Sequence, residues 1–123
     1  KIFHHSYESK KNISVLLEVN TSGERQKNGF LLSQKDEIIK CFLDKDTMVD
    51  GLMTIGPHTS NKKRIRKSFV SLRELKERLC DENEDIEIKH LSMGMSGDYE
   101  IAVEEGSTMV RLGSLLYGVR NQL

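Results

Sequence analysis

Four short, largely apolar stretches along the chain predict buried strands, at residues 12–20, 47–55, 86–93 and 108–112. Their apolar residues run together instead of alternating with polar ones, which is typical of parallel strands covered on both faces. The segments between these stretches have amphipathic patterns that predict helices. Because strand and helix alternate four times, the pattern indicates an α/β fold with a parallel sheet.

The predicted helices have recognisable ends. Ser33, with Asp36 three residues later, forms a capping box for the first helix. The second and longest helix covers about 61–79, with a basic face opposite its apolar stripe. Ser96 is the expected N-cap of a third helix, and Gly106 is the expected residue just beyond its end. A last short helix is expected after Gly113. The apolar stripe of the longest helix consists of Ile65, Phe69, Leu72, Leu75 and Leu79.

The number of units limits the architecture. A chain of 123 residues with four βα units is half of an eight-stranded barrel, which needs about 250 residues. A small open sheet of the flavodoxin type also accommodates four strands, and the pattern alone leaves both architectures open. Residues 1–123 are expected to form a single domain, which is a partial domain if the chain is half of a barrel.

Charge and cysteine content exclude several classes of protein. The chain has 19 Lys and Arg against 19 Asp and Glu, whereas a dedicated nucleic-acid-binding protein carries a basic excess. The longest apolar runs are far shorter than the roughly 20 residues of a membrane span. Cys41 and Cys80 form no C-x-x-C motif, and the histidines lack metal-ligand spacing. We therefore expect no nucleic acid, membrane or metal partner, and a reduced cytoplasmic location, or a mitochondrial one in a eukaryote.

The residues that follow the predicted strands are the candidates for ligand binding, because parallel α/β folds bind ligands at the carboxyl ends of their strands. All four junctions contain glycine, at 20–23, 56–58, 94–97 and 113–114. The last two open predicted helices, whose free N–H groups suit a phosphate. Ordinary capping and turn formation explain the same residues, and the acidic Asp98 counts against an anion.

One arginine and one lysine fall inside predicted strands. Arg111 lies in the fourth strand, where a charge is costly unless it is paired or liganded. Either a ligand contact or a salt bridge at the end of the strand compensates this cost. Lys89 lies in the third strand, where its ammonium either reaches the rim of the sheet or has a function.

Several sequence blocks, in order along the chain, carry a resemblance to a known family. They are V-L-L-E-V-N-T-S-G-E-x-x-K-x-G at 15–29, G-L-M-T-I-G at 51–56, L-S-M-G-M-S-x-D at 91–98 and G-S-T-M-V-R-L-G at 106–113, followed by Y-G-V-R. With this spacing the chain resembles the C-terminal half of the YggS/PROSC family of pyridoxal-phosphate homeostasis proteins. The resemblance implies half of a (β/α)8 barrel of the alanine racemase N-terminal type.

The resemblance also implies a cofactor, pyridoxal 5′-phosphate (PLP), and residues that hold it. Ser96, Gly113 and Ser114 are expected to contact the phosphate, and Arg111 to face the pyridine nitrogen. Two residues at the ends of their strands, Asn20 and Met53, are lesser candidates for lining the pocket. The family is one of carriers that buffer PLP and deliver it to apo-enzymes, so no catalytic residue is assigned.

The chemistry of an arginine at that position agrees with a carrier. A guanidinium beside the pyridine nitrogen disfavours its protonation, because two cations repel, and an unprotonated ring is a weaker electron sink. The alternative is an amino-acid racemase of the same barrel type, which also tolerates this arrangement. A racemase needs a second acid–base residue opposite the lysine, and Tyr99 and Tyr117 both fall on predicted helices.

The chain departs from the family pattern in one respect. The family's Schiff-base lysine lies in a block resembling A-V-S-K-T, and neither this block nor the following G-E-N block is present. Lys27 and Lys89 do not match the cofactor lysine. We therefore expect a half-barrel without its covalent anchor, with open sheet edges that favour self-association or poor solubility. The remaining alternative is a truncated remnant that does not bind PLP.

Overall fold

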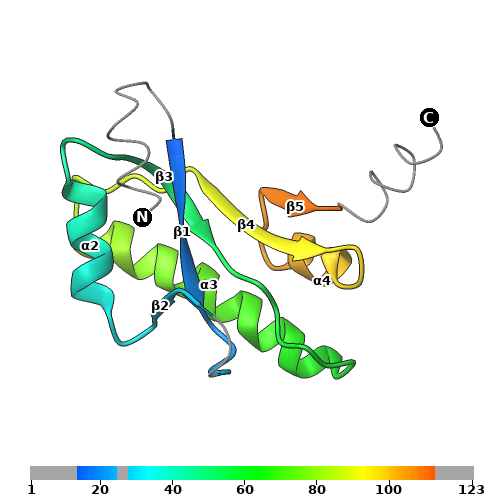
Figure 1. Cartoon of the computed structure of the whole chain (residues 1–123). Helices are drawn as coiled ribbons and strands as arrows, with labels where there is room; N and C mark the ends of the chain where they lie inside the picture. The colour runs from blue at the N-terminus through cyan, green and yellow to red at the C-terminus, as the bar shows by residue number, and fades with distance from the viewer. Residues whose placement is uncertain (1–13, 25–27, 113–123) are drawn as a thin grey trace, which may run out of the picture.

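The computed structural model describes residues 14–24 and 28–112. These residues form one sheet of five strands in the order β2-β1-β3-β4-β5, with every pairing parallel, and three helices (Figure 1). The elements in chain order are β1 (Ser14–Asn20), β2 (Phe30–Leu31), α2 (Lys35–Leu43), β3 (Met48–Met53), α3 (Lys62–Glu82), β4 (His90–Met95), α4 (Tyr99–Glu104) and β5 (Met109–Arg111).

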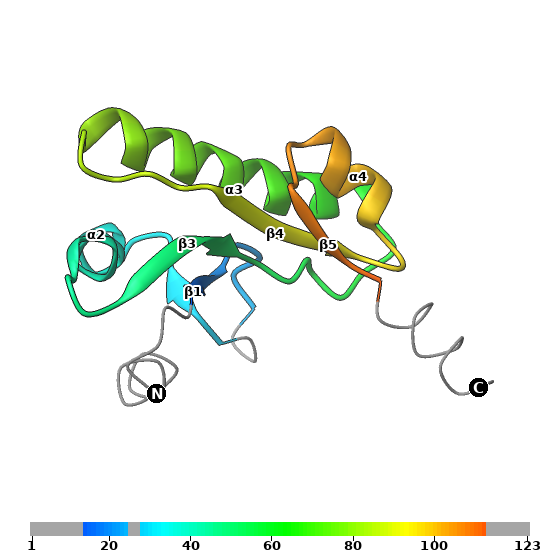
Figure 2. The same ribbon diagram turned by 90° about the horizontal axis from the view of Figure 1, so that it is seen from above.

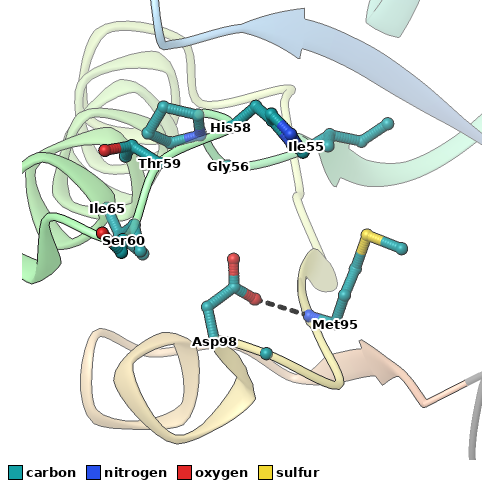
Figure 3. A pocket seen from close by; sticks show the side chains of 10 residues that line it. Ile55, Gly56, His58, Thr59, Ser60, Ile65, Met95 and Asp98 are labelled. Carbon is teal, nitrogen blue, oxygen red and sulfur yellow. Dashed lines mark hydrogen bonds between the residues drawn. The ribbon is translucent and has the colours of Figure 1, made fainter.

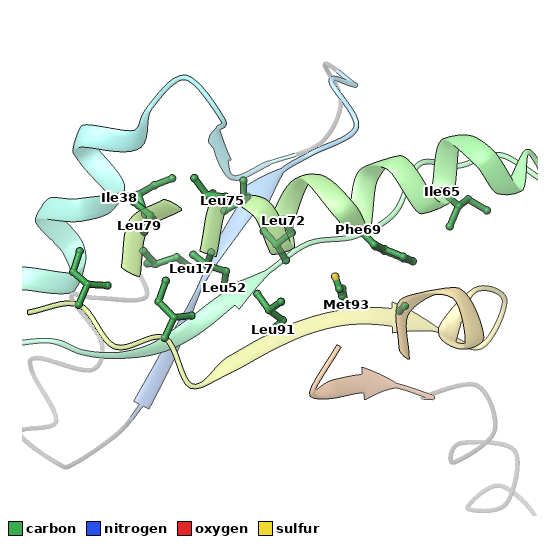
Figure 4. Packing of buried hydrophobic residues seen from close by; sticks show 14 residues of the cluster. Leu17, Ile38, Leu52, Ile65, Phe69, Leu72, Leu75, Leu79, Leu91 and Met93 are labelled. Atoms are coloured by element: carbon green, nitrogen blue, oxygen red, sulfur yellow. The ribbon is translucent and has the colours of Figure 1, made fainter. Parts of the chain in front are cut away.

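The three helices share one hydrophobic core with the sheet. Figure 2 shows α3 and α4 on the same side of the strands, and Ile38 of α2 belongs to the same buried cluster. The strand register aligns Leu17 with Leu52 and Leu52 with Leu91, and all three belong to the same buried cluster as the apolar stripe of α3 (Figure 4). A doubly wound sheet carries helices on both faces. Within the described residues the helices cover a single face, as in the wall of a barrel, and the predicted parallel α/β half-barrel is confirmed.

The opposite face of the sheet carries no helix within the described residues. Side chains alternate along a strand, so the residues next to the core row point away from the helices. This second row runs across the sheet through Glu18, Met53, Ser92 and Met109, which are register partners in turn. In a closed barrel such a row faces the interior. The prediction that both faces are covered is wrong for the described part of the chain.

Two of the predicted helix starts are corrected. The Ser33 capping box is wrong: α2 begins at Lys35 after Gln34, with no side-chain cap. A tight turn between Leu31 and Gln34 occupies this segment, because the Gln34 N–H donates to the Leu31 carbonyl at 2.9 Å and the Gln34 Oε1 accepts from the Leu31 N–H at 2.9 Å. The start of α3 is confirmed, with Asn61 Oδ1 accepting from the N–H groups of Lys63 and Arg64 at 3.0 and 3.2 Å.

The strands also differ in detail from the prediction. The third predicted strand, 86–93, starts too early, because β4 begins at His90. Ile86 and Ile88 are buried at 5% exposure each without belonging to a strand, so their apolar character reflects core packing alone. The two-residue strand β2, which pairs with Val19 and Asn20, was not predicted, since two residues carry no periodicity.

An ion network joins α3 to the C-terminal end of α4. Glu105 accepts hydrogen bonds from Arg66 and from Arg73, the second at 2.6 Å, and Arg66 also contacts Glu104 at 2.6 Å. The Glu105 side chain is 12% exposed, whereas that of Glu104 is 63% exposed. The hydrogen bond from Arg66, assisted by Arg73, lowers the pKa of Glu105 against the opposing effect of burial. Glu105 is therefore the centre of the network.

We expect this network to make the stability of the chain depend on acidic pH. A carboxyl whose pKa is lowered by folding stabilises the fold above its unfolded pKa, about 4.5, and this contribution disappears as the pH falls through the lower folded value. Glu105→Gln should reduce the thermal midpoint at pH 7 and flatten its fall below pH 4.5. Thermal unfolding between pH 7 and pH 3 measures both effects. Glu104→Gln, at the exposed arm of the network, is the control and should change little; equal effects of the two variants would contradict the assignment.

Candidate functional site

The carboxyl ends of the parallel strands bring four of the predicted site residues to one edge of the sheet. Asn20 is the last residue of β1, Met53 the last of β3 and Arg111 the last of β5, and Ser96 directly follows β4. In barrels of this type ligands bind at this edge. Gly113 and Ser114, like the last predicted helix, lie outside the described residues.

Arg111 has the geometry of a residue prepared for a ligand. Its side chain reaches from β5 across β4 to the end of β3, where Nη2 donates to the Thr54 carbonyl at 3.1 Å. Its Nε–H is buried and has no hydrogen-bond partner. Buried donors are almost always paired, and no carboxylate among the described residues forms an ion pair with Arg111. The strand-end salt bridge considered from the sequence is therefore absent from the described part of the chain.

Asn20 organises the loop that follows β1. Its Nδ2 donates to the Glu24 carbonyl at 2.8 Å, and its Oδ1 accepts from the Gly23 N–H at 3.0 Å and from the Ser22 hydroxyl at 3.3 Å. Asparagine commonly folds a loop back on itself in this way. With an exposure of 8%, Asn20 shapes the edge of the site, and its side chain is already engaged by the protein.

Ser96 lies in a turn and does not cap α4, so that prediction is wrong. The turn is closed by the Asp98 N–H donating to the Met95 carbonyl at 3.1 Å and by Asp98 Oδ1 accepting from the Met95 N–H at 2.7 Å. The N-cap of α4 is Asp98, whose side chain makes no cap bond. Asp98 bonds back into the turn, which displaces the helix start by two residues. The other end agrees with the prediction, since Gly106 follows the C-cap Glu105 with φ of 102°.

A pocket of about 470 Å³ separates this turn from the loop after β3 (Figure 3). The Asp98 carboxylate faces Gly56 across it, and His58 and Thr59 lie on the same side as Gly56. Among the described residues that line the pocket, none is a lysine or an arginine. A carboxylate without a neighbouring cation repels a phosphate, so this pocket is unsuited to that part of the predicted ligand.

Three further residues discussed from the sequence are placed by the fold. Met53 is half-buried in the row that faces away from the helices. Lys89 precedes β4 and its N–H donates to the Asp50 carbonyl at 2.8 Å, which puts it at the amino end of the sheet, opposite the candidate site. Tyr99 is the first residue of α4, as expected of a helical residue. Within the described residues there is also no cluster of acidic, histidine and cysteine side chains able to hold a metal.

Sequence reasoning missed Thr54, the residue after β3. Thr54 is completely buried, and its carbonyl is the group that holds Arg111. Its hydroxyl donates to the Val19 carbonyl at 2.6 Å and lies 2.8 Å from that of Thr21. The available signal was a single polar residue inside the apolar run L-M-T-I, which is also what an ordinary half-buried strand residue looks like.

Comparison with known proteins places the chain among its relatives. Residues 2–121 match the family model described as alanine racemase, N-terminal domain. The chain belongs to this family. None of the helices in the described part of the chain is long and apolar enough to cross a membrane.

Two curated relatives share one name. The chain is 45% identical over 114 residues to the pyridoxal phosphate homeostasis protein of Aquifex aeolicus, covering 90% of this chain and 50% of the relative. It is 38% identical over 117 residues to the human protein of the same name, covering 92% and 42%. The resemblance read from the sequence blocks is confirmed, and the chain spans about half the length of the curated relatives it matches.

Solved structures agree on the fold. PipY of Synechococcus elongatus without PLP superposes with a TM-score of 0.82 at 25% identity, covering 94% of this chain and 54% of that one. The structure of PipY with PLP bound superposes with a TM-score of 0.77 at 23% identity, covering 94% and 53%. A protein from Bifidobacterium adolescentis, described as unknown, gives 0.80 at 35% identity, covering 92% and 46%.

Proposed function

We propose that this chain binds PLP at the carboxyl edge of its sheet and serves in PLP homeostasis, holding the cofactor reversibly and releasing it to apo-enzymes. The observation that carries the proposal is Arg111, whose Nη2 is fixed on the Thr54 carbonyl while its buried Nε–H has no partner. An unsatisfied buried donor costs about 1–3 kcal/mol. A ligand that supplies an acceptor at this point removes that cost.

The ring nitrogen of PLP fits this donor. Pyridine nitrogen accepts a hydrogen bond when it is unprotonated, and a permanently charged guanidinium beside it keeps it so. The family resemblance assigns Ser96, Gly113 and Ser114 to the phosphate, and Ser96 follows β4 at the same edge of the sheet as Arg111. PLP supplies an aldehyde and an electron-withdrawing ring when it is bound. Arg111 weakens the second property, which agrees with a carrier, and a racemase of the same barrel type tolerates it as well.

The names of the relatives support the same assignment. The Aquifex aeolicus and human relatives are called homeostasis proteins and not enzymes, and a PipY structure contains PLP. The proposal further places the protein in the cytoplasm, or in the mitochondrion of a eukaryote, with PLP-dependent apo-enzymes as recipients. The proposal also includes self-association. Met95 at the end of β4 and Met109 at the start of β5, the outermost described strand on this side of the sheet, are 46% and 42% exposed.

We expect Arg111→Gln to weaken PLP binding about ten- to hundredfold. This range follows from the loss of a hydrogen bond to a charged group, about 1.5–3 kcal/mol. Titration of the wild-type and variant chains with PLP, followed by absorbance and by calorimetry, measures the two dissociation constants.

The same samples examined by sedimentation velocity are expected to contain dimers and not monomers alone.

Arg78→Gln is the matched control, because it removes the same charge from an exposed position in the C-terminal half of α3. Its affinity should equal that of the wild type. Borohydride reduction followed by mass spectrometry should trap no adduct, since the lysine block of the family is missing. Equal binding by both variants would sink the assignment of Arg111, and the absence of PLP binding by the wild type would favour a non-binding remnant.

A further inference from the structure

Thr54 connects four strands at the edge where Arg111 lies. Its N–H donates to the Ser92 carbonyl of β4 at 3.0 Å, and its hydroxyl donates to the Val19 carbonyl of β1 at 2.6 Å. Its own carbonyl, just beyond the end of β3, accepts from Arg111 of β5 at 3.1 Å. The residue has no exposed surface, so each of these polar groups is bonded within the protein.

From this arrangement we propose that Thr54 is the positioning residue that holds Arg111 for its ligand. Thr54 acts through the arginine and has no contact with the ligand itself. The inference rests on the proposed function, because it gives Arg111 the ring nitrogen of PLP as its target. It adds a requirement that the assignment of Arg111 alone does not contain, namely that the hydroxyl of Thr54 controls the guanidinium.

The hydroxyl of Thr54 is the inner end of a hydroxyl chain, a series of hydrogen-bonded hydroxyls in Thr54, Thr21 and Ser68. The direction of donation along this series is determined. The Val19 carbonyl can only accept, so the single hydroxyl proton of Thr54 is used there. Thr21 must therefore donate to Thr54, across 2.8 Å, and Ser68 of α3 must donate to Thr21. Hydrogen bonds that run in one direction polarise and strengthen one another. The hydroxyl chain thus fixes the loop after β3 to both β1 and α3.

A fixed carbonyl determines what remains free on the arginine. The guanidinium is a rigid plane with five N–H donors, so anchoring Nη2 on Thr54 restricts the rotation of the whole group. The donor that stays buried and unpaired is Nε–H. If the loop carrying Thr54 moves, the plane turns and Nε–H finds water or another acceptor. The hydroxyl chain therefore keeps the donor available for a ligand.

The first test uses the chain without PLP. Proton exchange of the Arg111 Nε–H with water is followed by NMR, with Arg111→Lys used to assign the signal. Thr54→Val keeps the carbonyl and the size of the side chain but removes the hydroxyl. We expect exchange to become about five- to tenfold faster, as for the loss of one ordinary hydrogen bond. Thr54→Ser, which restores the hydroxyl, should return it to the wild-type rate.

A matched control separates positioning from general loosening. Ser107→Ala removes a hydroxyl that lies 2.7 Å from the Met93 carbonyl and 2.8 Å from the Met109 carbonyl, outside the series of hydroxyls formed by Thr54, Thr21 and Ser68. It should leave the Nε–H exchange rate unchanged. If Thr54→Val fails to fold, Thr21→Val breaks the next bond of the chain and should accelerate exchange in the same direction. Unchanged exchange in the folded Thr54 or Thr21 variant would overturn the inference.

The second test uses PLP and a property that a purely structural role does not change. With Arg111 in position, the ring nitrogen of bound PLP should resist protonation, and its absorbance should stay constant over a wider acidic range than that of free PLP. Thr54→Val should shift this protonation toward that of free PLP, and Thr54→Ser should reverse the shift. If the wild type binds no PLP, the proposed function fails, whereas the exchange experiment still decides the role of Thr54.

Discussion

Phe69→Ala is expected to remove a large part of the free energy of unfolding of the chain. The Phe69 side chain is completely buried in the core between α3 and the sheet, and removing a buried phenyl ring costs about 3–5 kcal/mol. Small domains have a total free energy of unfolding of about 5–15 kcal/mol. Chemical denaturation followed by circular dichroism measures the loss.

The same substitution reaches the candidate site. A β-carbon placed on Gly56 would lie 3.3 Å from the Phe69 ring, so this ring supports the loop after β3. The control is Val103→Ala on α4, where the side chain is 56% exposed and the cost should stay below about 1 kcal/mol. A loss from Phe69→Ala no larger than this would show that the core is not the one described.

Gly51→Ala is expected to disrupt the pairing of β3 with β4. A β-carbon at Gly51 would overlap the backbone carbonyl oxygen and the carbonyl carbon of His90, its register partner in β4. Backbone has less room to yield than a flexible side chain, so we expect destabilisation of about 1–3 kcal/mol or more. The thermal midpoint and the exchange of amide protons in β3 and β4 measure it.

Gly97→Ala is the matched control for this prediction. A β-carbon at Gly97 would meet no atom within 4 Å, and the residue lies in the turn after β4. The substitution should change stability by no more than about 0.5 kcal/mol. If both glycine variants lose the same stability, the cost belongs to glycine replacement in general and not to the close approach at His90.

The part of the fold that could be predicted is the part with strong hydrophobic periodicity. The stripe from Ile65 to Leu79 repeats at helical spacing and determined α3 to within a few residues. The helix starts were less predictable. The expected caps Ser33 and Ser96 are not used, because the side chains of the residues at the helix starts, Gln34 and Asp98, bond to the turns before the helices. Which face of the sheet stays uncovered depends on how strands pair, and residues distant in the sequence decide that.

The candidate site shows a similar division. Arg111 was identifiable because a charge inside an apolar strand needs a reason, and the structure supplies one in an unpaired buried donor. The ligand of Arg111 was predicted from the resemblance of the sequence blocks to the family. Thr54 was not identifiable, because its importance comes from bonds to Val19 and Arg111, which are 35 and 57 residues away in the sequence. Contacts of this kind leave no local pattern.

The sequential pairing of the strands also bears on how the chain is made. Along the series β1, β3, β4 and β5, each strand pairs with the one synthesised before it, so a nascent chain can extend its sheet as each segment leaves the ribosome. Thr54 precedes Arg111 by 57 residues, which at about 5–20 residues per second is a delay of roughly 3–11 seconds. The carbonyl that receives the arginine is therefore synthesised several seconds before the arginine itself.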